Sequence, residues 1–368
     1  IYPSGITSLL DLKENRLLIG FSDGMIGVYD IENRKFIFQN ISGHSNTIFT
    51  IQFPSINQDI FLTSGGEGAI CTWNASTMKL IDRLPPFEVF GSMFSMDISP
   101  GGGMVSCGYS KGIISFFSLQ TRAKLFHTQI CESKIISLKF STFEPELLIA
   151  SSDGENCLIY NVTEKRTIWI ADSEYHPSIG LFSIHNKNQI FVTSHDGFVY
   201  IYLSLKNTPD IKIEDPLQSD LYFISFSPIR KDIFITSDNS GYIKYWSFTE
   251  RSVEVIGQHK GKSRPICFHP FMENLIASSG YDGVVMIHDL QDKQVISSFT
   301  AHTSNVYSIS FSPTNPNLLI TSASDSSIKF WSIDSIFMKT VLKNIMSQKL
   351  DWIRPLEGYA QLLKLIKR

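Results

Sequence analysis

The sequence lacks the features that mark membrane, metal-binding and nucleic-acid-binding proteins. No apolar run approaches the length of about eighteen residues that a membrane-spanning helix needs, so we expect no transmembrane segment. The formal net charge is -3, and without a basic excess we expect neither nucleic acid nor an acidic membrane as a partner. The histidines show no H-E-x-x-H or other metal-ligand spacing. We therefore expect no metal and no other cofactor.

Cysteine is scarce, and its positions do not indicate disulfide bonds. The five cysteines form no C-x-x-C pair and lie mostly within apolar, strand-like runs: Cys71, Cys107, Cys131, Cys157 and Cys267. This pattern is typical of reduced thiols in the core of an intracellular protein. We expect a cytoplasmic location, with the nucleus and the cilium as alternatives. The sequence leaves open whether further residues precede Ile1 or follow Arg368.

Repetition is the strongest feature that the sequence does have. The segments "LTSGGEGAICTWNA" (62–75), "ITSDNSGYIKYWSF" (235–248) and "ITSASDSSIKFWSI" (320–333) share one pattern of an apolar run, a small polar turn and a second apolar run. Such units recur along the chain in steps of 42 to 44 residues when they are aligned on the residue near the end of the second run: Tyr29, Trp73, Phe117, Tyr160, Tyr202, Trp246, His288 and Trp331. A period of this length indicates a repeat architecture.

Each unit contains four short strand-like runs separated by Gly, Pro, Asn, Asp and Ser. Four short strands per repeat are typical of a propeller blade, which buries its faces against its neighbours around a central axis. The sequence therefore predicts an all-β fold, a β-propeller of eight four-stranded blades over residues 6–342. A ring of seven blades with an extra unit is the alternative.

Polar residues recur at fixed places in three of the units. The last unit has a His, a hydroxyl residue, an Asp and a Trp, and the seventh and second units have most of the same set: His302, Thr321, Asp325 and Trp331; His259, Ser278 and Asp282; His44, Thr63 and Trp73. In these residues and in its period the chain resembles the WD-repeat β-propellers. The resemblance implies that each set forms one buried hydrogen-bonded network with a structural role.

The chain also departs from this family pattern. No Trp is followed by Asp, although that dipeptide names the family. The seventh unit has His288 where Trp is expected, and the second has Glu67 where Asp is expected. Because Glu is one methylene longer than Asp, we expect the network of the second unit to be disturbed.

The resemblance implies a platform for other proteins. We expect a non-catalytic scaffold or adaptor in a multi-subunit complex, with no small-molecule substrate, because the repeated hydroxyls lie in the middle of strands. Two alternatives stay open: a propeller-type hydrolase, and a reader of peptides or modified protein tails that uses the central channel.

The family pattern also indicates which side chains face partners. Its top face carries residues at the start of each first strand and just before the turn Asp: Phe49, Phe94, Tyr222, Arg264, Tyr307 and Tyr281. Tyr and Arg often dominate binding energies, so we expect Tyr222, Arg264, Tyr281 and Tyr307 to form one contact patch. Packing of these residues against neighbouring loops is the alternative.

The end of the chain, residues 343–368, lies outside the repeats. Its apolar residues are three or four positions apart, which predicts a short amphipathic helix: Leu356, Tyr359, Leu363 and Ile366. We expect this helix to pack against the propeller or to bind a partner. The first helix of a helical solenoid and a helix on a membrane surface are the alternatives.

Overall fold

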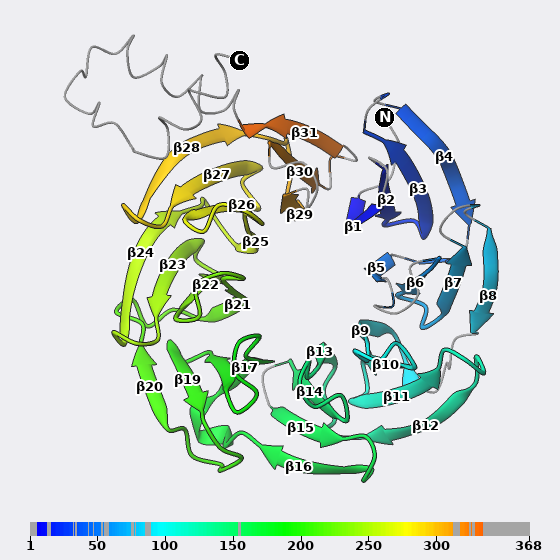
Figure 1. The fold of residues 1–368 in the computed structure, drawn as a ribbon, viewed down its shortest axis with the longest axis horizontal. Helices are drawn as coiled ribbons and strands as arrows, with labels where there is room; N and C mark the ends of the chain where they lie inside the picture. Colours follow the sequence, from blue (N-terminus) through cyan, green and yellow to red (C-terminus); the bar gives the residue numbers. More distant parts are fainter. Residues whose placement is uncertain are drawn as a thin grey trace.

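The computed structural model shows blades arranged in a ring around an open centre (Figure 1). It describes residues 6–12, 16–31, 33, 35–42, 44–46, 48–52, 54, 59–74, 77, 79–84, 90–153, 156–311, 317–323, 325 and 328–333. The predicted helix in 343–368 and the end of the predicted propeller, 334–342, lie outside these residues.

The first four blades follow one another along the chain. Blade one contains β1 (Ile6–Leu12), β2 (Arg16–Phe21), β3 (Met25–Asp30) and β4 (Lys35–Ser42). Blade two contains β5 (Ile48–Gln52), β6 (Ile60–Gly65), β7 (Ile70–Asn74) and β8 (Leu80–Leu84). Blade three contains β9 (Met93–Ile98), β10 (Met104–Tyr109), β11 (Ile113–Ser118) and β12 (Lys124–Gln129). Blade four contains β13 (Ile135–Phe140), β14 (Leu147–Ser152), β15 (Cys157–Asn161) and β16 (Arg166–Ile170).

The second half of the chain repeats the arrangement. Blade five begins after a short 3₁₀ turn (Ser173–Tyr175) and contains β17 (Pro177–Phe182), β18 (Ile190–Ser194), β19 (Phe198–Tyr202) and β20 (Ile211–Glu214). Blade six contains β21 (Leu221–Phe226), β22 (Ile233–Asp238), β23 (Tyr242–Ser247) and β24 (Ser252–Gln258). Blade seven contains β25 (Ser263–Phe268), β26 (Leu275–Gly280), β27 (Val284–Asp289) and β28 (Gln294–Thr300). Blade eight has three described strands, β29 (Val306–Phe311), β30 (Leu318–Ala323) and β31 (Ile328–Ser332).

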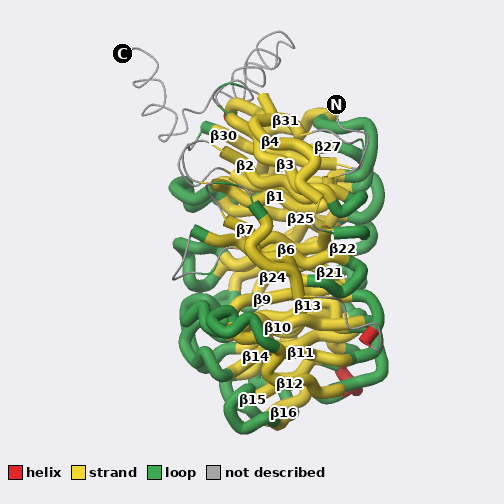
Figure 2. Tube along the Cα trace, turned by 90° about the vertical axis from the view of Figure 1, so that its right-hand side faces the viewer, coloured by secondary structure: helices red, strands yellow, loops and turns green. Residues whose placement is uncertain are grey.

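Within each blade the strands are antiparallel and pair in chain order. The first strand lies next to the central channel and the last strand lies at the circumference (Figure 1). The loops and turns therefore lie on the two faces of the ring (Figure 2). We call "top" the face with the second-to-third-strand turns and the loops that enter each blade, and "bottom" the face with the first-to-second and third-to-fourth turns. The prediction of eight blades is confirmed.

The blades are held together by apolar side chains between neighbouring sheets. Middle strands such as β14 and β15 are buried along their whole length, because a neighbouring blade covers each of their faces. Phe191 of blade five packs edge-on against Phe234 of blade six, whose ring in turn stacks on Trp246. Outer strands such as β12 alternate half-buried and exposed residues. This difference in burial explains why, within one unit, the runs that form the middle strands are more apolar than the run that forms the outer strand.

Candidate protein-interaction surface

Blade eight brings its four predicted polar residues together near the top face. Trp331 Nε1 donates to Thr321 Oγ1 at 2.9 Å, and this oxygen lies 2.8 Å from His302 Nε2. His302 Nδ1 lies 3.0 Å from Asp325 Oδ2, which also accepts from the backbone N–H of Thr303 at 3.1 Å. Burial lowers the pKa of His302, although Asp325 opposes this effect. The network therefore joins a top turn to the loop that enters the blade.

Blade two forms the contacts among His, hydroxyl, Trp and acid with Glu67 in place of Asp, although Glu67 Oε2 is buried without a hydrogen-bond partner. The expected disturbance is therefore confined to this one oxygen. Glu67 Oε1 lies 2.7 Å from His44 Nδ1, and Thr63 Oγ1 lies 2.7 Å from His44 Nε2 and accepts from Trp73 at 2.9 Å. The extra methylene fits because the neighbouring residue is Gly65. A Cβ atom at Gly65 would lie only 2.2 Å from Glu67 Oε2 and 2.4 Å from His44 Nδ1.

Blade seven uses His288 in the place of Trp. Ser278 Oγ lies 2.8 Å from His288 Nε2 and 2.9 Å from His259 Nε2. His259 Nδ1 lies 3.2 Å from Asp282 Oδ1. Ser278 thus bridges the two imidazole rings, and His288 Nδ1 lies 3.3 Å from the carbonyl oxygen of Ile256.

The His288 ring should make stability depend on pH. Burial lowers the pKa of His288 to about 3, whereas an unfolded His titrates near 6.5. Between these values the unfolded chain binds more protons, so stability falls as the pH falls from 6.5 towards 3. At pH 5 the loss from this residue is about 2 kcal/mol. Between pH 7.5 and pH 5, the free energy of unfolding of His288→Gln should therefore fall by about 2 kcal/mol less than that of the parent chain. Urea unfolding at the two pH values measures this difference.

A matched variant controls for the loss of any histidine. His127 lies exposed on β12, so His127→Gln removes an imidazole without altering the buried network. Equal pH slopes for His288→Gln and the parent chain would contradict the assignment.

Blade six contains a charged network that the sequence analysis missed. Lys244 is fully buried, and its Nζ lies 2.6 Å from Asp215 Oδ2 and 2.7 Å from Asp238 Oδ2. It also donates to Ser219 Oγ. Burial alone would raise the pKa of Asp215, but the hydrogen bonds from Lys244 and Ser219 hold it below its usual value. One signal was present in the sequence, a Lys in the middle of the apolar strand "YIKYWS".

This charged network replaces the His–Asp pair of other blades. Asp215 lies 44 residues before His259, one repeat earlier, at the same place in its blade. Blade six keeps the hydrogen bond between Trp and the hydroxyl residue, since Trp246 Nε1 donates to Thr236 Oγ1 at 2.8 Å. Asp238 Oδ1 accepts from the backbone of Ser240 at 2.9 Å and so fixes the top turn. Different chemistry thus serves one purpose, the anchoring of a top turn to the incoming loop.

The hydroxyl residues of these networks cannot act as nucleophiles in this arrangement. Thr63, Ser278 and Thr321 are completely buried, so no substrate can reach their oxygens. The networks instead fix the backbone of the top face.

The residues predicted at the start of the first strands share one backbone feature. In each of these blades the pairing of the first and second strands shifts at a β-bulge near the start of the first strand. Five of the predicted residues occupy these bulges: Phe49, Phe94, Tyr222, Arg264 and Tyr307. A bulge redirects a side chain away from the sheet.

Two of these bulge residues form an aromatic pair on neighbouring blades. Phe49 is 40% exposed, and its ring centroid lies 5.6 Å from that of half-buried Phe94. Lys134 Nζ lies 5.8 Å from the centre of the Phe94 ring. Tyr281, in a top turn of blade seven, is also half-exposed. The side chains of Tyr222, Arg264 and Tyr307 lie outside the described part of the structure.

Few charged side chains of the central channel are described by the structure. On the first strands, the charged side chains that the structure describes are Asp97 and Lys139, and they form an ion pair at 2.8 Å. Asp97 also accepts from the backbone N–H of Phe140 at 2.8 Å and from Gln52 Nε2 at 3.2 Å. These contacts use the carboxylate within the ring, so it is not available to a peptide tail in the channel.

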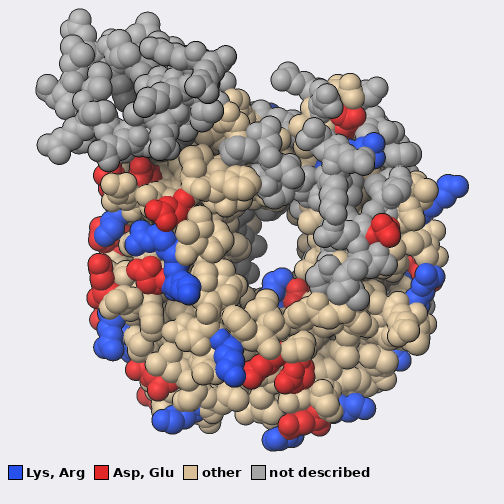
Figure 3. Space-filling view, viewed as in Figure 1, with Lys and Arg blue, Asp and Glu red and all other residues tan. Residues whose placement is uncertain are grey.

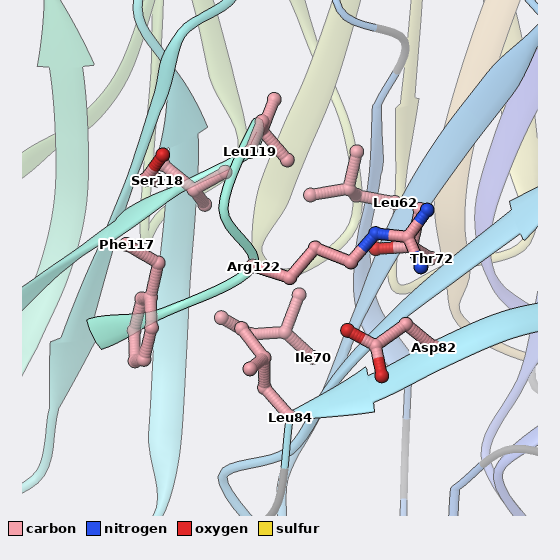
Figure 4. Close-up of a pocket in the computed structure, with 10 residues that line it drawn as sticks. Leu62, Ile70, Thr72, Asp82, Leu84, Phe117, Ser118, Leu119 and Arg122 are labelled. Carbon is pink, nitrogen blue, oxygen red and sulfur yellow. The ribbon is translucent and has the colours of Figure 1, made fainter.

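A small cleft lies between blades two and three (Figure 4). Asp82 and Arg122 point towards each other across it, and Phe117 forms part of its wall. Its interior has about 10 Å³ of free space, the room of one water molecule. The cleft is too small to hold a substrate.

Other kinds of site are absent from the described residues. There, no three His, Cys, Asp or Glu residues gather as metal ligands would, and no helix is long and apolar enough to cross a membrane. Figure 3 shows acidic and basic residues interspersed around the ring, without a large area of one sign on the face in view.

Comparison with known proteins agrees with this geometry. The model of the family "WD domain, G-beta repeat" matches residues 293–332. The chain is 24% identical to human nucleoporin Nup43 over 229 residues, which cover 56% of this chain and 59% of that protein. It is 25% identical to the histone acetyltransferase type B subunit 2 of Candida glabrata over 202 residues, 51% of this chain and 48% of that protein.

A plant relative matches over a smaller share of its length. Protein SUPPRESSOR OF PHYA-105 1 of Arabidopsis thaliana is 33% identical over 119 residues, which cover 30% of this chain and 12% of that protein. The chain thus spans less than two thirds of these relatives. Among solved structures, the computationally designed Ika8 protein superposes with a TM-score of 0.76 at 19% identity, covering 90% of this chain and 97% of that one, which shows the fold alone. In its eight blades, its His–hydroxyl–acid networks and these matches, the chain resembles the WD-repeat β-propellers.

Proposed function

We propose that the protein is a non-catalytic scaffold that binds other proteins through the top face of the ring. The observation that carries this proposal is the Phe49–Phe94 pair, because a large exposed aromatic ring beside a second ring on the next blade marks a protein contact site. Tyr281 extends the proposed surface to blade seven. The bulges and anchored turns hold these residues on a rigid backbone, which reduces the entropy lost on binding.

The rest of the predicted patch is part of the same proposal. Tyr222, Arg264 and Tyr307 lie at the bulges of blades six to eight. We assign them the same partner-binding role as Phe49, Phe94 and Tyr281. Residues 334–342 would complete blade eight, and 343–368 would form a helix that contacts the propeller or a partner.

Loss of the top-face aromatic residues should remove partners without unfolding the protein. We expect the double variant Phe49→Ala, Tyr281→Ala to recover its partners at least about 30-fold less efficiently, since loss of an anchor residue costs about 2 kcal/mol or more. The measurement is affinity purification of the tagged full chain with quantitative mass spectrometry. Leu125→Ala, on the exposed outer strand β12, is the matched control. Equal recovery of all partners by the double variant and the control would overturn the proposal.

The same purification tests whether residues 343–368 bind partners of their own. A variant that ends at Leu342 keeps the partners of the propeller and loses those of the tail if the C-terminal segment is a separate contact. The relatives include a nucleoporin and a histone acetyltransferase subunit, which favours the nuclear alternative over the cytoplasmic location. Imaging of the tagged chain tests this location.

A further inference from the structure

Four consecutive blades, four to seven, have the same turn between their first and second strands on the bottom face. In each, a side-chain atom of the first turn residue accepts from the backbone N–H groups two and three residues later. The acceptors and donors are Ser141 with Phe143 (3.3 Å) and Glu144 (3.1 Å), Ser183 with His185 (3.2 Å) and Asn186 (3.3 Å), Ser227 with Ile229 (3.4 Å) and Arg230 (3.0 Å), and His269 with Phe271 (3.1 Å) and Met272 (2.8 Å). Such side-chain caps stabilise tight turns.

The backbone closes each turn a second time. The residue that follows the turn donates its N–H to the carbonyl of the fourth turn residue at 2.9 to 3.4 Å, as Leu147 does to Glu144. The four capping side chains are all buried: Ser141, Ser183, Ser227 and His269. The turns are therefore rigid and well defined.

Each of these turns presents an apolar side chain to solvent. The exposed residues and their exposed fractions are Phe143 at 47%, Ile184 at 44%, Ile229 at 44% and Phe271 at 58%. Phe143, Ile229 and Phe271 are the third residues of their turns and Ile184 is the second. The third position does not need an apolar residue. In blade three the third residue of the turn is Gly101, and a Cβ atom at that place would meet nothing within 4 Å. The Phe271 ring contacts the His269 ring edge-on, with centroids 6.1 Å apart. About half of each of the four side chains is nevertheless exposed, so their apolar character calls for another explanation.

Neighbouring turns are also fixed relative to one another. His185 Nε2, in the turn of blade five, lies 2.7 Å from the carbonyl oxygen of Ser227, in the turn of blade six. In blade seven, the His269 ring packs edge-on against Phe311 of blade eight, with centroids 4.8 Å apart. The exposed apolar residues thus lie on capped turns of four consecutive blades, and the turns of blades five and six are joined directly.

The charges beside these apolar residues indicate the class of partner. The four turns carry four acidic and three basic residues: Glu144, Glu146, Asp232, Glu273, Lys187, Arg230 and Lys231. A nucleic acid or an anionic membrane would require a clear basic excess. Apolar side chains flanked by charges of both signs instead complement the apolar stripe and mixed polar edges of an amphipathic helix.

We propose that the bottom row, defined as Phe143, Ile184, Ile229 and Phe271, is a second docking surface that binds an amphipathic helix of a protein partner. It rests on the proposed scaffold function only in that its ligand is a protein. It lies on the face opposite to Phe49 and Tyr281, so the two surfaces can be occupied together.

The test places the photoreactive residue p-benzoylphenylalanine at position 271 of the full chain in cells that produce the protein. On irradiation we expect an adduct at 271 whose partner peptide has apolar residues three and four positions apart. Position 125 on β12 is the matched control, because Leu125 is 48% exposed but lies at the circumference. Ile229→Asp should reduce the yield of the adduct at 271 at least tenfold, whereas Ile170→Asp on β16 should not.

Every outcome decides the proposal. Equal adducts at 271 and 125, an adduct to a second copy of this chain, an adduct to RNA or lipid, a partner peptide without an apolar stripe, or no adduct would each overturn it. Should Ile229→Asp lower the melting temperature, Ile229→Ser replaces it. If the Phe49 and Tyr281 double variant loses its partners while the adduct at 271 is unchanged, the proposal for the bottom row stands independently of the top face. If the double variant keeps its partners while the adduct at 271 is absent, only the bottom-row proposal fails.

Discussion

Lys244→Met should lower the free energy of unfolding by about 3–5 kcal/mol, because it leaves two buried carboxylates without their counter-charge. Asp215 and Asp238 are as fully buried as Lys244 itself. Ser219 would remain as their shared hydrogen-bond partner, but a hydroxyl cannot neutralise two charges. Urea unfolding at pH 7 measures the effect.

Two further variants separate the loss of charge balance from the loss of a lysine. In blade eight, Lys329 lies two residues before Trp331, as Lys244 lies two residues before Trp246, and it donates to the carbonyl oxygen of Ala301 at 2.5 Å. Lys329→Met should cost only about 1.5–3 kcal/mol, the value of a single hydrogen bond from a charged group. Combining Lys244→Met with Asp215→Asn and Asp238→Asn should recover part of the loss, since no buried charge then remains. Equal losses for Lys244→Met and Lys329→Met would show that the buried network does not behave as an ion cluster.

Asp325→Ala should lower the free energy of unfolding by about 1–3 kcal/mol, because it leaves buried polar groups without a partner. The groups concerned are His302 Nδ1 and the backbone N–H of Thr303. Partner binding at the bottom row should not change, because this network is at the top face of another blade. Thermal melting and the photocrosslinking yield at position 271 measure the two effects.

A conservative exchange provides the control. Asp325→Glu copies the acid of blade two, but the residue before the turn in blade eight is Ala323, where blade two has Gly65. We therefore expect Asp325→Glu to be destabilising unless it is combined with Ala323→Gly. An unchanged melting temperature for Asp325→Ala would contradict the role assigned to the network.

The blade architecture could be predicted because each unit must repeat the same lengths of strand and turn. The polar networks could be predicted where the family residues occur, and the structure places the His, hydroxyl and acid groups of blades two, seven and eight within hydrogen-bond distance. The fit of Glu67 could not be predicted, since it depends on the space that Gly65 leaves in three dimensions.

Two other features were beyond the sequence for different reasons. The Lys244 network joins residues that are 29 positions apart, and no local pattern connects them. The bottom row was missed because an apolar residue in a turn can be either packed or exposed, and only coordinates distinguish Phe271, which is exposed, from Phe311, which is buried.

The junction between blades one and eight has a consequence for synthesis of the chain. Every other pair of neighbouring blades is joined by a peptide connection, whereas at this junction the described residues meet only through side chains, such as Ile6 and Phe21 with Ile320. As the chain leaves the ribosome, each blade can pack against its predecessor as soon as it forms. Until Ile320 is made, however, one apolar flank of blade one and one of the newest blade stay in water. We expect the nascent chain to need chaperones until the eighth blade arrives, and the completed ring to release them.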